Sequence, residues 1–355
     1  MLVGICGSIC SGRHTVQDYL VREHDFQRLS IEPSTPTSGQ LTLPELHDAT
    51  NNPPFKSFPT VEALLDFATQ NWQTNFVTTS IHTTATATTL SHRPFFLLLH
   101  IDAPVSIRYA RYLSLHSRGT SSTPLSDFVS ASEAHLYTPT TNPLALLASK
   151  AHLQLLNNSP SLPSLYKSLN RLNILDPARL RPNWDTYFMT LASLAARRSN
   201  CMRRQVGCVL IRSNRVISTG YNGTPRHLLN CLSGGCPRCN SASSVGGTSL
   251  STCLCLHAEE NALLEAGRER VGEGSVLYCD TCPCLTCSIK IVQVGISEVV
   301  FAKGYYMDEA AERVFREGGV KLRRFEAVVG GLVVLGGDKE GMEGTVNGVN
   351  GTAVA

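Results

Sequence analysis

The hydrophobic positions in the second half of the chain follow helical and strand periods in turn. Residues 183–198 carry apolar side chains at helical spacing. Two runs rich in β-branched residues follow at 206–211 and 216–220, and the Ser213-Asn214 pair between them predicts a tight hairpin turn. The elements expected beyond the hairpin are helices at 257–267, from 284 and at 307–317, and strands at 275–279, 298–301 and 320–325. This alternation predicts an α/β sandwich with five strands and helices on both faces.

Two of the expected helices begin with residues that bind metals. His257-Ala-Glu259 opens one helix, and Pro283-Cys284-Leu-Thr-Cys287 opens the other. We expect these helices to follow neighbouring strands, which would bring their N-termini together at one edge of the sheet. One imidazole and two thiolates are three ligands for a tetrahedral Zn²⁺, and they leave the fourth position to water. A carboxylate such as Glu259 beside that water is a proton shuttle.

The spacing of these residues favours a zinc site over a chance grouping. Cys284 and Cys287 are three positions apart, so both sulfurs project from the first turn of one helix, where the helix dipole favours the thiolate. The alternative is a core histidine, a surface glutamate and an unrelated redox Cys-x-x-Cys pair. Ligand types, their order and the helical context all agree instead with the His-x-Glu and Pro-Cys-x-x-Cys signature of the zinc nucleobase deaminases.

Residues 182–326 resemble the deoxycytidylate (dCMP) deaminase family, within the cytidine deaminase superfamily. The resemblance lies in the motifs Gln205-Val-Gly-Cys-Val, Gly220-Tyr-Asn-Gly-Thr-Pro225, Cys255-Leu-His-Ala-Glu-Glu-Asn-Ala and Asp280-Thr-Cys-Pro-Cys-Leu-Thr-Cys287. It implies a cytidine-deaminase-like three-layer α/β/α sandwich with a five-stranded mixed sheet. It also implies zinc-dependent hydrolysis of dCMP to dUMP and ammonia, which supplies thymidylate synthesis. Members of this family are usually homohexamers that dCTP activates and dTTP inhibits.

Two other functions share the zinc pattern. One is a zinc deaminase that acts on a tRNA or DNA base or on a small cytosine- or purine-type heterocycle, and the other is a non-catalytic zinc-binding scaffold. The formal net charge of only +3 and the Gly220-Tyr-Asn-Gly loop argue against a polynucleotide substrate, and we expect no stable nucleic-acid partner. The presence of Glu259 argues against a scaffold, because a structural zinc uses a fourth protein ligand instead.

The residues that would contact the nucleotide are less clear from the sequence. The resemblance implies a substrate contact for Asn222, although Asn-Gly is also a turn signal. Tyr305 and Tyr306 fall where the family carries a tyrosine near the nucleotide, although both are equally compatible with ordinary packing after a strand. The candidate phosphate-binding cations are Arg203, Arg204 and Arg226, which are also compatible with a solvated surface.

A second group of cysteines lies just before the His257 helix. Its members are Cys231, Cys236, Cys239, Cys253 and Cys255. They predict a second, structural zinc, with free thiols as the alternative, and the sequence leaves open which four would bind the ion. The Ser/Gly-rich residues 240–252 between them predict a mobile loop. Because no secretory signal is recognisable, we expect reduced thiols and a cytoplasmic location, with the nucleus also possible.

The start of the chain predicts a strand, a glycine loop and a helix. Gly7 and Gly12 have the spacing of a phosphate-binding loop, but Arg13 replaces the loop lysine and His14 replaces the metal-binding Ser or Thr. With a buried strand expected within 94–104, this region resembles small P-loop nucleoside and dephospho-coenzyme A kinases with a degenerate loop. An active kinase, a regulatory nucleotide-binding domain and a purely structural domain remain the alternatives, and the first is disfavoured because arginine is a poor substitute for that lysine.

These patterns divide the chain into three parts. Residues 1–175 are the degenerate P-loop-like α/β domain, with Ser/Thr/Pro-rich loops at 33–52 and 118–141. Residues 180–326 are the zinc-dependent deaminase domain, and 327–355 are a Gly/Val/Ala-rich tail that we expect to be poorly ordered. A length of 355 residues with 42% hydrophobic content fits two globular domains. The sequence has no apolar run long enough for a membrane span, so no membrane partner is expected.

Overall fold

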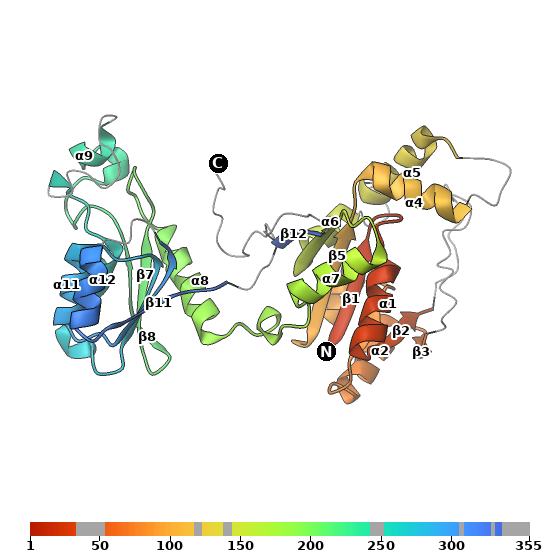
Figure 1. The fold of residues 1–355 in the computed structure, drawn as a ribbon, viewed down its shortest axis with the longest axis horizontal. Coiled ribbons are helices and arrows are strands. Elements are labelled where there is room, and N and C mark those ends of the chain that lie inside the picture. Colours follow the sequence, from red (N-terminus) through yellow and green to blue (C-terminus); the bar gives the residue numbers. More distant parts are fainter. Residues whose placement is uncertain are drawn as a thin grey trace. The chain divides into compact units, whose positions relative to one another are not determined.

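The computed structural model of the chain describes residues 1–32, 54–116, 123–137, 144–241, 252–304, 309–327 and 331–335. This part of the chain forms two compact units (Figure 1). The N-terminal unit comprises Met1–Arg181 and also takes in the strand β12 (Gly331–Leu335). The deaminase-like unit begins at Pro182 and runs through β11 (Lys321–Arg324). Each unit is considered separately below.

The N-terminal unit is built on a seven-stranded sheet in the order β12-β6-β5-β1-β4-β2-β3, with parallel pairings throughout. Its other strands are β1 (Leu2–Gly7), β2 (Gln27–Ile31), β3 (Lys56–Phe58), β4 (Phe76–Thr78), β5 (Phe96–Asp102) and β6 (Leu153–Asn157). Its α-helices are α1 (Arg13–His24), α2 (Val61–Gln70), α3 (Thr84–Leu90), α4 (Val105–His116), α5 (Leu125–Tyr137), α6 (Leu144–Ser149) and α7 (Leu162–Leu172).

Helices cover both faces of this sheet, and its central strand β1 is therefore buried on both sides. Val3 and Ile5 pack into a core with α1, α7 and β12, whereas Leu2 and Cys6 pack into a second core with α2, α3 and α6. A parallel strand between two helical layers is expected to be apolar at every position, as β1 is. The expected strand within 94–104 is confirmed as β5, directly beside β1.

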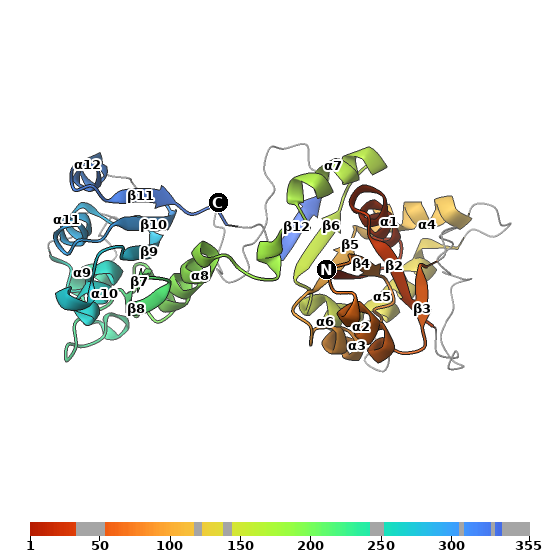
Figure 2. The ribbon, with the colours of Figure 1, turned by 90° about the horizontal axis from the view of Figure 1, so that it is seen from below.

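The expected disorder of the tail is wrong for β12. This strand pairs in parallel with β6 at the edge of the sheet, as Figure 2 shows, with Val333 aligned to Leu155. Val333 and Leu335 are fully buried in the core, whereas the alternating residues Leu332 and Val334 are exposed. This alternation is the pattern of a half-buried strand, and it was hidden in the sequence because glycines flank so short an apolar run.

The expected loop at 118–141 is also wrong in part. Residues 125–137 form α5, whose Phe128 packs against Tyr109 and Tyr112 of α4. Tertiary packing of this aromatic group therefore overrides the weak helical signal of a Ser/Thr-rich sequence. Residues 33–52, the other expected loop, lie outside the described residues.

The second unit has a five-stranded mixed sheet in the order β11-β10-β9-β7-β8, as expected. Its strands are β7 (Gly207–Arg212), β8 (Arg215–Tyr221), β9 (Val276–Thr281), β10 (Glu298–Lys303) and β11. Its α-helices are α8 (Trp184–Ala196), α9 (Pro237–Asn240), α10 (Ala258–Ala266), α11 (Leu285–Gln293) and α12 (Glu309–Glu317). Alternate residues of β7 face opposite layers: Cys208 and Leu210 pack with α10, α11 and α12, and Val209 and Ile211 pack with α8. The three-layer α/β/α sandwich is therefore confirmed.

The connections in this sheet agree with the sequence at one point and differ at another. Ser213 and Asn214 have φ values of 50° and 57°, so the predicted hairpin turn between β7 and β8 is confirmed. The helices α10 and α11 follow β8 and β9, which are not neighbours, because β7 lies between them. The expectation of neighbouring strands was wrong because local patterns do not reveal that β7 returns to pair with β9.

Among the described residues, no helix combines the length and the apolar character needed to cross a membrane.

Candidate metal centre and active site

Three predicted zinc ligands meet where α10 and α11 begin. The Nδ1 atom of His257 lies 3.3 Å from the Cys284 sulfur and 3.4 Å from the Cys287 sulfur. The three ligand atoms lie within 4.8 Å of one another. In a tetrahedral site, zinc–ligand bonds of about 2.0–2.3 Å place nitrogen and sulfur about 3.6 Å apart. The donor types and their spacing therefore fit a zinc ion with three protein ligands.

The starts of the two helices hold these ligands in place. His257 is the N-cap of α10 and Cys284 is the N-cap of α11, one residue after Pro283. The Glu260 carboxylate accepts a hydrogen bond of 3.0 Å from the His257 backbone N–H, which completes a capping box. Glu260 also forms an ion pair with Lys290 of α11. One carboxylate thus fixes the histidine backbone and ties the two ligand-bearing helices together.

The two cysteine ligands differ in how readily they lose a proton. The pKa of Cys284 is lowered to about 3, above all because its sulfur accepts a hydrogen bond from Cys287, with a further contribution from His257. The pKa of Cys287 is raised by the same hydrogen bond and by burial. Zinc binding would displace the Cys287 proton, since only the thiolate binds the metal strongly.

Glu259 lies beside the three ligands in a dry environment. Glu259 is only 4% exposed, and burial raises the pKa of its carboxyl group to about 7. His257 and Cys284 are close enough for their charges to influence this pKa. A carboxyl group with a pKa near neutrality both accepts and returns protons, as a proton shuttle must.

Gly220 lets α10 approach the sheet closely enough to carry His257 and Glu259 to this place. A side-chain carbon at Gly220 would lie 2.0 Å from the Ala258 carbonyl oxygen and 2.5 Å from the Ala262 nitrogen. Only glycine fits between β8 and the first turns of α10. The first glycine of the Gly-Tyr-Asn-Gly motif is therefore explained by packing.

Asn222 links this motif to the segment that leads into β7. Its side-chain Oδ1 accepts a hydrogen bond of 2.8 Å from the Val206 N–H, and its Nδ2 donates one of 2.7 Å to the Arg204 carbonyl. Its backbone carbonyl accepts a 2.7 Å hydrogen bond from Ser199. The structure therefore uses this nearly buried side chain to position residues 199–206. The turn interpretation of Asn222 is wrong, because the next residue, Gly223, pairs with Leu256 in an isolated β-bridge.

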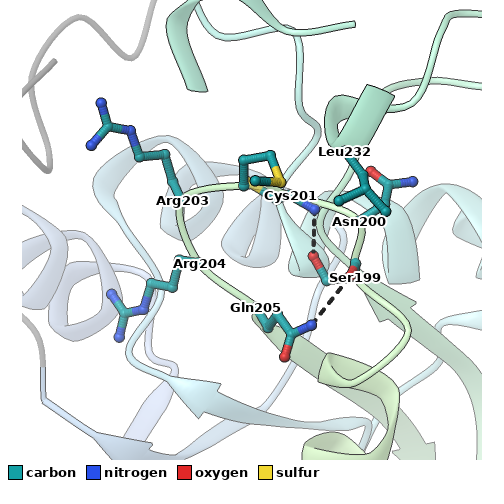
Figure 3. Close-up of a pocket in the computed structure, with 8 residues that line it drawn as sticks. Ser199, Asn200, Cys201, Arg203, Arg204, Gln205 and Leu232 are labelled. Carbon is teal, nitrogen blue, oxygen red and sulfur yellow. Dashed lines mark hydrogen bonds between the residues drawn. The ribbon is translucent and has the colours of Figure 1, made fainter. Parts of the chain in front are cut away.

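The segment that Asn222 holds also lines a pocket of about 400 Å³ (Figure 3). Figure 3 shows Arg203 and Arg204 projecting to the same side of this segment. Arg204 donates a 3.1 Å hydrogen bond to Thr281 at the end of β9, a short distance along the chain from Cys284. The pocket is lined by Ser199, Asn200, Cys201, Met202, Arg203, Arg204, Gln205 and Leu232.

Arg226, the third candidate cation, is not among the residues that line this pocket. Arg226 is exposed and forms a surface ion pair with Glu265. Tyr305 and Tyr306 lie outside the described residues, so their predicted role stays a prediction.

The five predicted cysteines of the second group are brought together, with Cys201 as a sixth member. Cys231, Cys236, Cys239 and Cys255 are buried in one cluster, and Cys253 and Cys201 pack against it. The Cys239 sulfur lies 3.6 Å from that of Cys253 and 3.7 Å from that of Cys201. We missed Cys201 in the sequence because it stands far upstream of the others and outside any Cys-x-x-Cys pattern. Residues 242–251, most of the expected mobile loop, lie outside the described residues.

The glycine loop of the N-terminal unit has the expected shape but a different chemistry. It runs from β1 into α1, and Gly12 is the helix N-cap with φ 101°, a conformation that favours glycine. The Arg13 Nε donates a 3.0 Å hydrogen bond to the His14 ring, so the two substituted positions contact each other. Arg111 and Asn157 both donate hydrogen bonds of 3.0 Å to the Ser11 carbonyl. The loop is thus held by side chains from α4 and β6.

Comparisons with known proteins agree with the zinc site and extend beyond it. Residues 182–303 match the family model of the cytidine and deoxycytidylate deaminase zinc-binding region. The chain is 47% identical to deoxycytidylate deaminase of Schizosaccharomyces pombe over 323 residues, which cover 91% of this chain and 97% of that protein. The chain belongs to the deoxycytidylate deaminase family. Deoxycytidylate deaminase of Saccharomyces cerevisiae is 44% identical over 336 residues, covering 92% of this chain and 96% of that relative.

Membership of the deoxycytidylate deaminase family therefore rests on both units of the chain. By contrast, the match to human deoxycytidylate deaminase, at 35% identity, covers 40% of this chain and 79% of the human protein. Among solved structures, dCMP deaminase of cyanophage S-TIM5 in complex with dCMP and dUMP is 30% identical, with a TM-score of 0.31 and coverage of 39% of this chain and 94% of that one.

Proposed function

We propose that the chain hydrolyses dCMP to dUMP and ammonia in a zinc-dependent reaction. The observation that carries this proposal is the buried Glu259 beside three zinc ligands, in a chain that matches yeast deoxycytidylate deaminases across nearly its whole length. A three-ligand site leaves one position for water, as a catalytic zinc site requires. A buried carboxylate beside it is the group that deamination needs for proton transfer.

In the proposed mechanism, the protein residues hold the metal and move the protons. His257, Cys284 and Cys287 would hold Zn²⁺, which when bound lowers the pKa of water and so favours its attack on C4 of cytosine. Glu259 accepts a proton from the attacking water and passes it to N3 of the ring. Glu259 then takes the remaining proton from the hydroxyl group at C4 and delivers it to the amino group. The C4–N bond breaks, ammonia leaves and the C4 carbonyl of dUMP forms. Burial of Glu259 supports this role because it keeps the pKa of the carboxyl group near 7.

We also propose that dCTP activates and dTTP inhibits the chain, and that it assembles as a homohexamer. Family membership supports these proposals. A cytoplasmic or nuclear location is supported by the thirteen cysteines, none of which forms a disulfide.

The experiment that tests this function is an assay of ammonia release and product identity with dCMP, CMP, deoxycytidine and dCTP. Each is measured with and without dCTP and dTTP as effectors. We expect rapid turnover of dCMP alone, rising with dCTP and falling with dTTP. If the folded, zinc-loaded protein turned over none of these substrates, the substrate assignment would be wrong, and a polynucleotide base or another heterocycle would be tested next. If dCMP turnover did not respond to either triphosphate, only the regulatory proposal would fail.

A further inference from the structure

Six cysteine sulfurs gather in the deaminase-like unit at a place separate from the His257 site. They come from four segments: the stretch before β7, the 3₁₀ turn Cys231–Ser233, the short helix α9 with its N-cap, and the stretch before α10. The six residues are Cys201, Cys231, Cys236, Cys239, Cys253 and Cys255. Four separate chain segments that bring their cysteines together in one cluster are typical of a small domain held together by metal.

The six sulfurs divide into two sets of four that share two members. In each set the four sulfur atoms lie within 4.8 Å of one another. Cys201 and Cys231 belong only to the first set, and Cys236 and Cys253 belong only to the second. Cys239 and Cys255 belong to both. Two tetrahedra that share an edge have this arrangement, with six corners in all and two of them in common.

The measured distances fit that geometry. Zinc–sulfur bonds of about 2.3 Å place the sulfurs of a tetrahedral site about 3.8 Å apart. The Cys239 sulfur lies 3.9 Å from the Cys255 sulfur along the shared edge. It lies 3.7 Å from Cys201 in the first set and 3.6 Å from Cys253 in the second. All three separations are far longer than a disulfide bond of about 2.05 Å.

We propose that this cluster binds two zinc ions, bridged by the thiolates of Cys239 and Cys255. One zinc is completed by Cys201 and Cys231, and the other by Cys236 and Cys253. A single zinc bound by four of these residues would leave two further thiols packed against the site without a ligand role. With two ions, all six cysteines are ligands and both ions are four-coordinate, which is the usual geometry of structural zinc.

Hydrogen-bond donors around the cluster support thiolates over thiols. Six thiolates and two Zn²⁺ ions carry a net charge of −2, so donors directed at sulfur stabilise the cluster. The Met202 N–H donates to the Cys231 sulfur at 3.5 Å, and the Leu254 N–H donates to the Cys236 sulfur at 3.4 Å. The Asn240 amide donates to Cys231 at 3.8 Å, and the Arg238 guanidinium interacts with Cys253.

The cluster would also fix a segment of the active-site framework. Cys201 lies within residues 199–206. The bonds of Ser199 and Arg204 to Asn222 connect this segment to the end of β8, and the bond of Arg204 to Thr281 connects it to the end of β9. Binding of Cys201 to zinc would therefore anchor this segment at a further point, in addition to its bonds with Asn222. The two-zinc cluster is a positioning element, and it does not depend on which substrate the His257 site converts.

The test is the zinc content of the full-length protein, purified under reducing conditions and freed of loosely bound metal by brief exposure to a weak chelator. We expect about three zinc ions per chain by elemental analysis and native mass spectrometry: one at His257 and two in the cluster. Two ions would show that a single four-cysteine site replaces the bridged pair. One ion, iron in place of zinc, or disulfides between these cysteines would overturn the proposal altogether.

Variants assign the ions to the two sets. Cys201→Ser removes a ligand from the first set only and Cys253→Ser from the second only, so each is expected to lower the zinc content by one. Cys239→Ser removes a shared ligand and is expected to lower it by two. Cys6→Ser, a buried cysteine of the N-terminal unit, is the matched control and is expected to keep all three ions.

A measurement on the unaltered protein keeps the proposal testable if these variants fail to fold. After exchange with ¹¹³Cd, a bridged pair gives two cadmium resonances of all-sulfur sites that are coupled to each other through the shared thiolates. Two uncoupled resonances, or a single one, would overturn the bridging by Cys239 and Cys255.

Discussion

The His257 site and the glycine loop of the N-terminal unit are built from the same kind of element, yet of these two places only the His257 site groups metal-binding side chains among the described residues. Both place polar residues where a helix begins, with His257 and Gly12 as N-caps. At His257, the neighbouring side chains converge on a common point that fits zinc. At the loop, Arg13 bonds to His14, and the Ser11 carbonyl is occupied by Arg111 and Asn157.

This difference shows that the backbone of a binding loop can be kept while its chemistry changes. The glycines of the N-terminal loop retain their geometric role, because Gly12 has a positive φ and a side chain at Gly7 would lie 2.3 Å from the Ile101 carbonyl. The lysine and hydroxyl that would engage a triphosphate and its magnesium are replaced. An active kinase is therefore disfavoured by the structure as well as by the sequence, and the other two alternatives for this unit stay open.

The contrast between the His257 site and the glycine loop would fail most clearly if Glu259 were not needed for deamination. Glu259→Gln keeps the size of the side chain and removes its ability to accept a proton, so we expect a loss of at least about 100-fold in kcat with unchanged zinc content. The measurement is steady-state deamination of dCMP together with elemental analysis. Glu265→Gln, on the exposed side of the same helix, is the control and should be fully active. Activity of Glu259→Gln near that of the control would assign the proton transfer to another group.

The second prediction concerns the carboxylate that ties the two ligand-bearing helices together. Glu260→Ala removes both the bond to the His257 N–H and the ion pair with Lys290. Loss of a group that orients a metal ligand typically weakens metal binding about 10-fold to 100-fold, and we expect this for the catalytic zinc. Competition with a chromophoric chelator measures it, and Glu265→Ala is the control on the same helix. Equal zinc affinity in the two variants would show that Glu260 does not support the site.

A third prediction separates the framework of the deaminase-like unit from its chemistry. Asp185 at the start of α8 binds Arg323 of β11 through two hydrogen bonds of 2.6 and 3.0 Å, and accepts a third of 2.7 Å from Tyr278. The bond to Arg323 is the main reason why the pKa of Asp185 is lowered. Because these groups are partly exposed, we expect Asp185→Asn to reduce the free energy of unfolding by only about 1–2 kcal/mol at pH 7.

The pH dependence of that effect has a definite sign. A carboxyl group with a lowered pKa in the folded state stabilises the fold above its unfolded pKa of about 3.9, and this contribution disappears as the pH falls through the folded pKa. Urea unfolding at pH 7 and at successively lower pH should therefore show the difference between the variant and the unaltered chain shrinking below about pH 4. Glu317→Gln, in an exposed ion pair with Arg313, is the control and should change stability little. A constant difference at all pH values would exclude the ionised Asp185 as its source.

The smallest effect is expected from Arg13→Ala in the N-terminal loop. If this unit takes no part in the chemistry, kcat for dCMP at saturating substrate should stay within about twofold, since a surface or accessory substitution perturbs function little. Thermal unfolding of the same variant controls for a loss of folded protein. A large fall in kcat with intact folding would show that the loop contributes to turnover.

The parts of the fold that were predictable from the sequence are those set by neighbouring residues. The turn at Ser213-Asn214, the helix starts at His257 and Cys284, and the five-stranded sheet all follow from local patterns. The parts that were not predictable depend on partners distant in the sequence. Cys201 joins the cysteine cluster only through contacts with cysteines at least 30 positions further along the chain. The place of β7 between β8 and β9 likewise depends on strand pairing that local patterns do not show.

The role of Asn222 illustrates the same limit within the site. The sequence offered a substrate contact or a turn, and the structure shows a framework role that neither pattern indicated: both polar atoms of the amide bond to the backbone of residues 204 and 206. The substrate contact stays a prediction. Asn222 follows β8, whereas residues 204 and 206 precede β7. Because two strands separate these residues in the sequence, no local pattern could indicate their hydrogen bonds.

The strand β12 has a consequence for the order in which the protein is made. Because β12 belongs to the N-terminal sheet and follows every helix and strand that the structure describes in the deaminase-like unit, a ribosome makes those elements before it supplies β12. Until then the β6 edge lacks its partner, and the side chains that Val333 and Leu335 will cover remain exposed on the nascent chain. The sheet that begins first thus receives this strand only after the described elements of the other unit have been made.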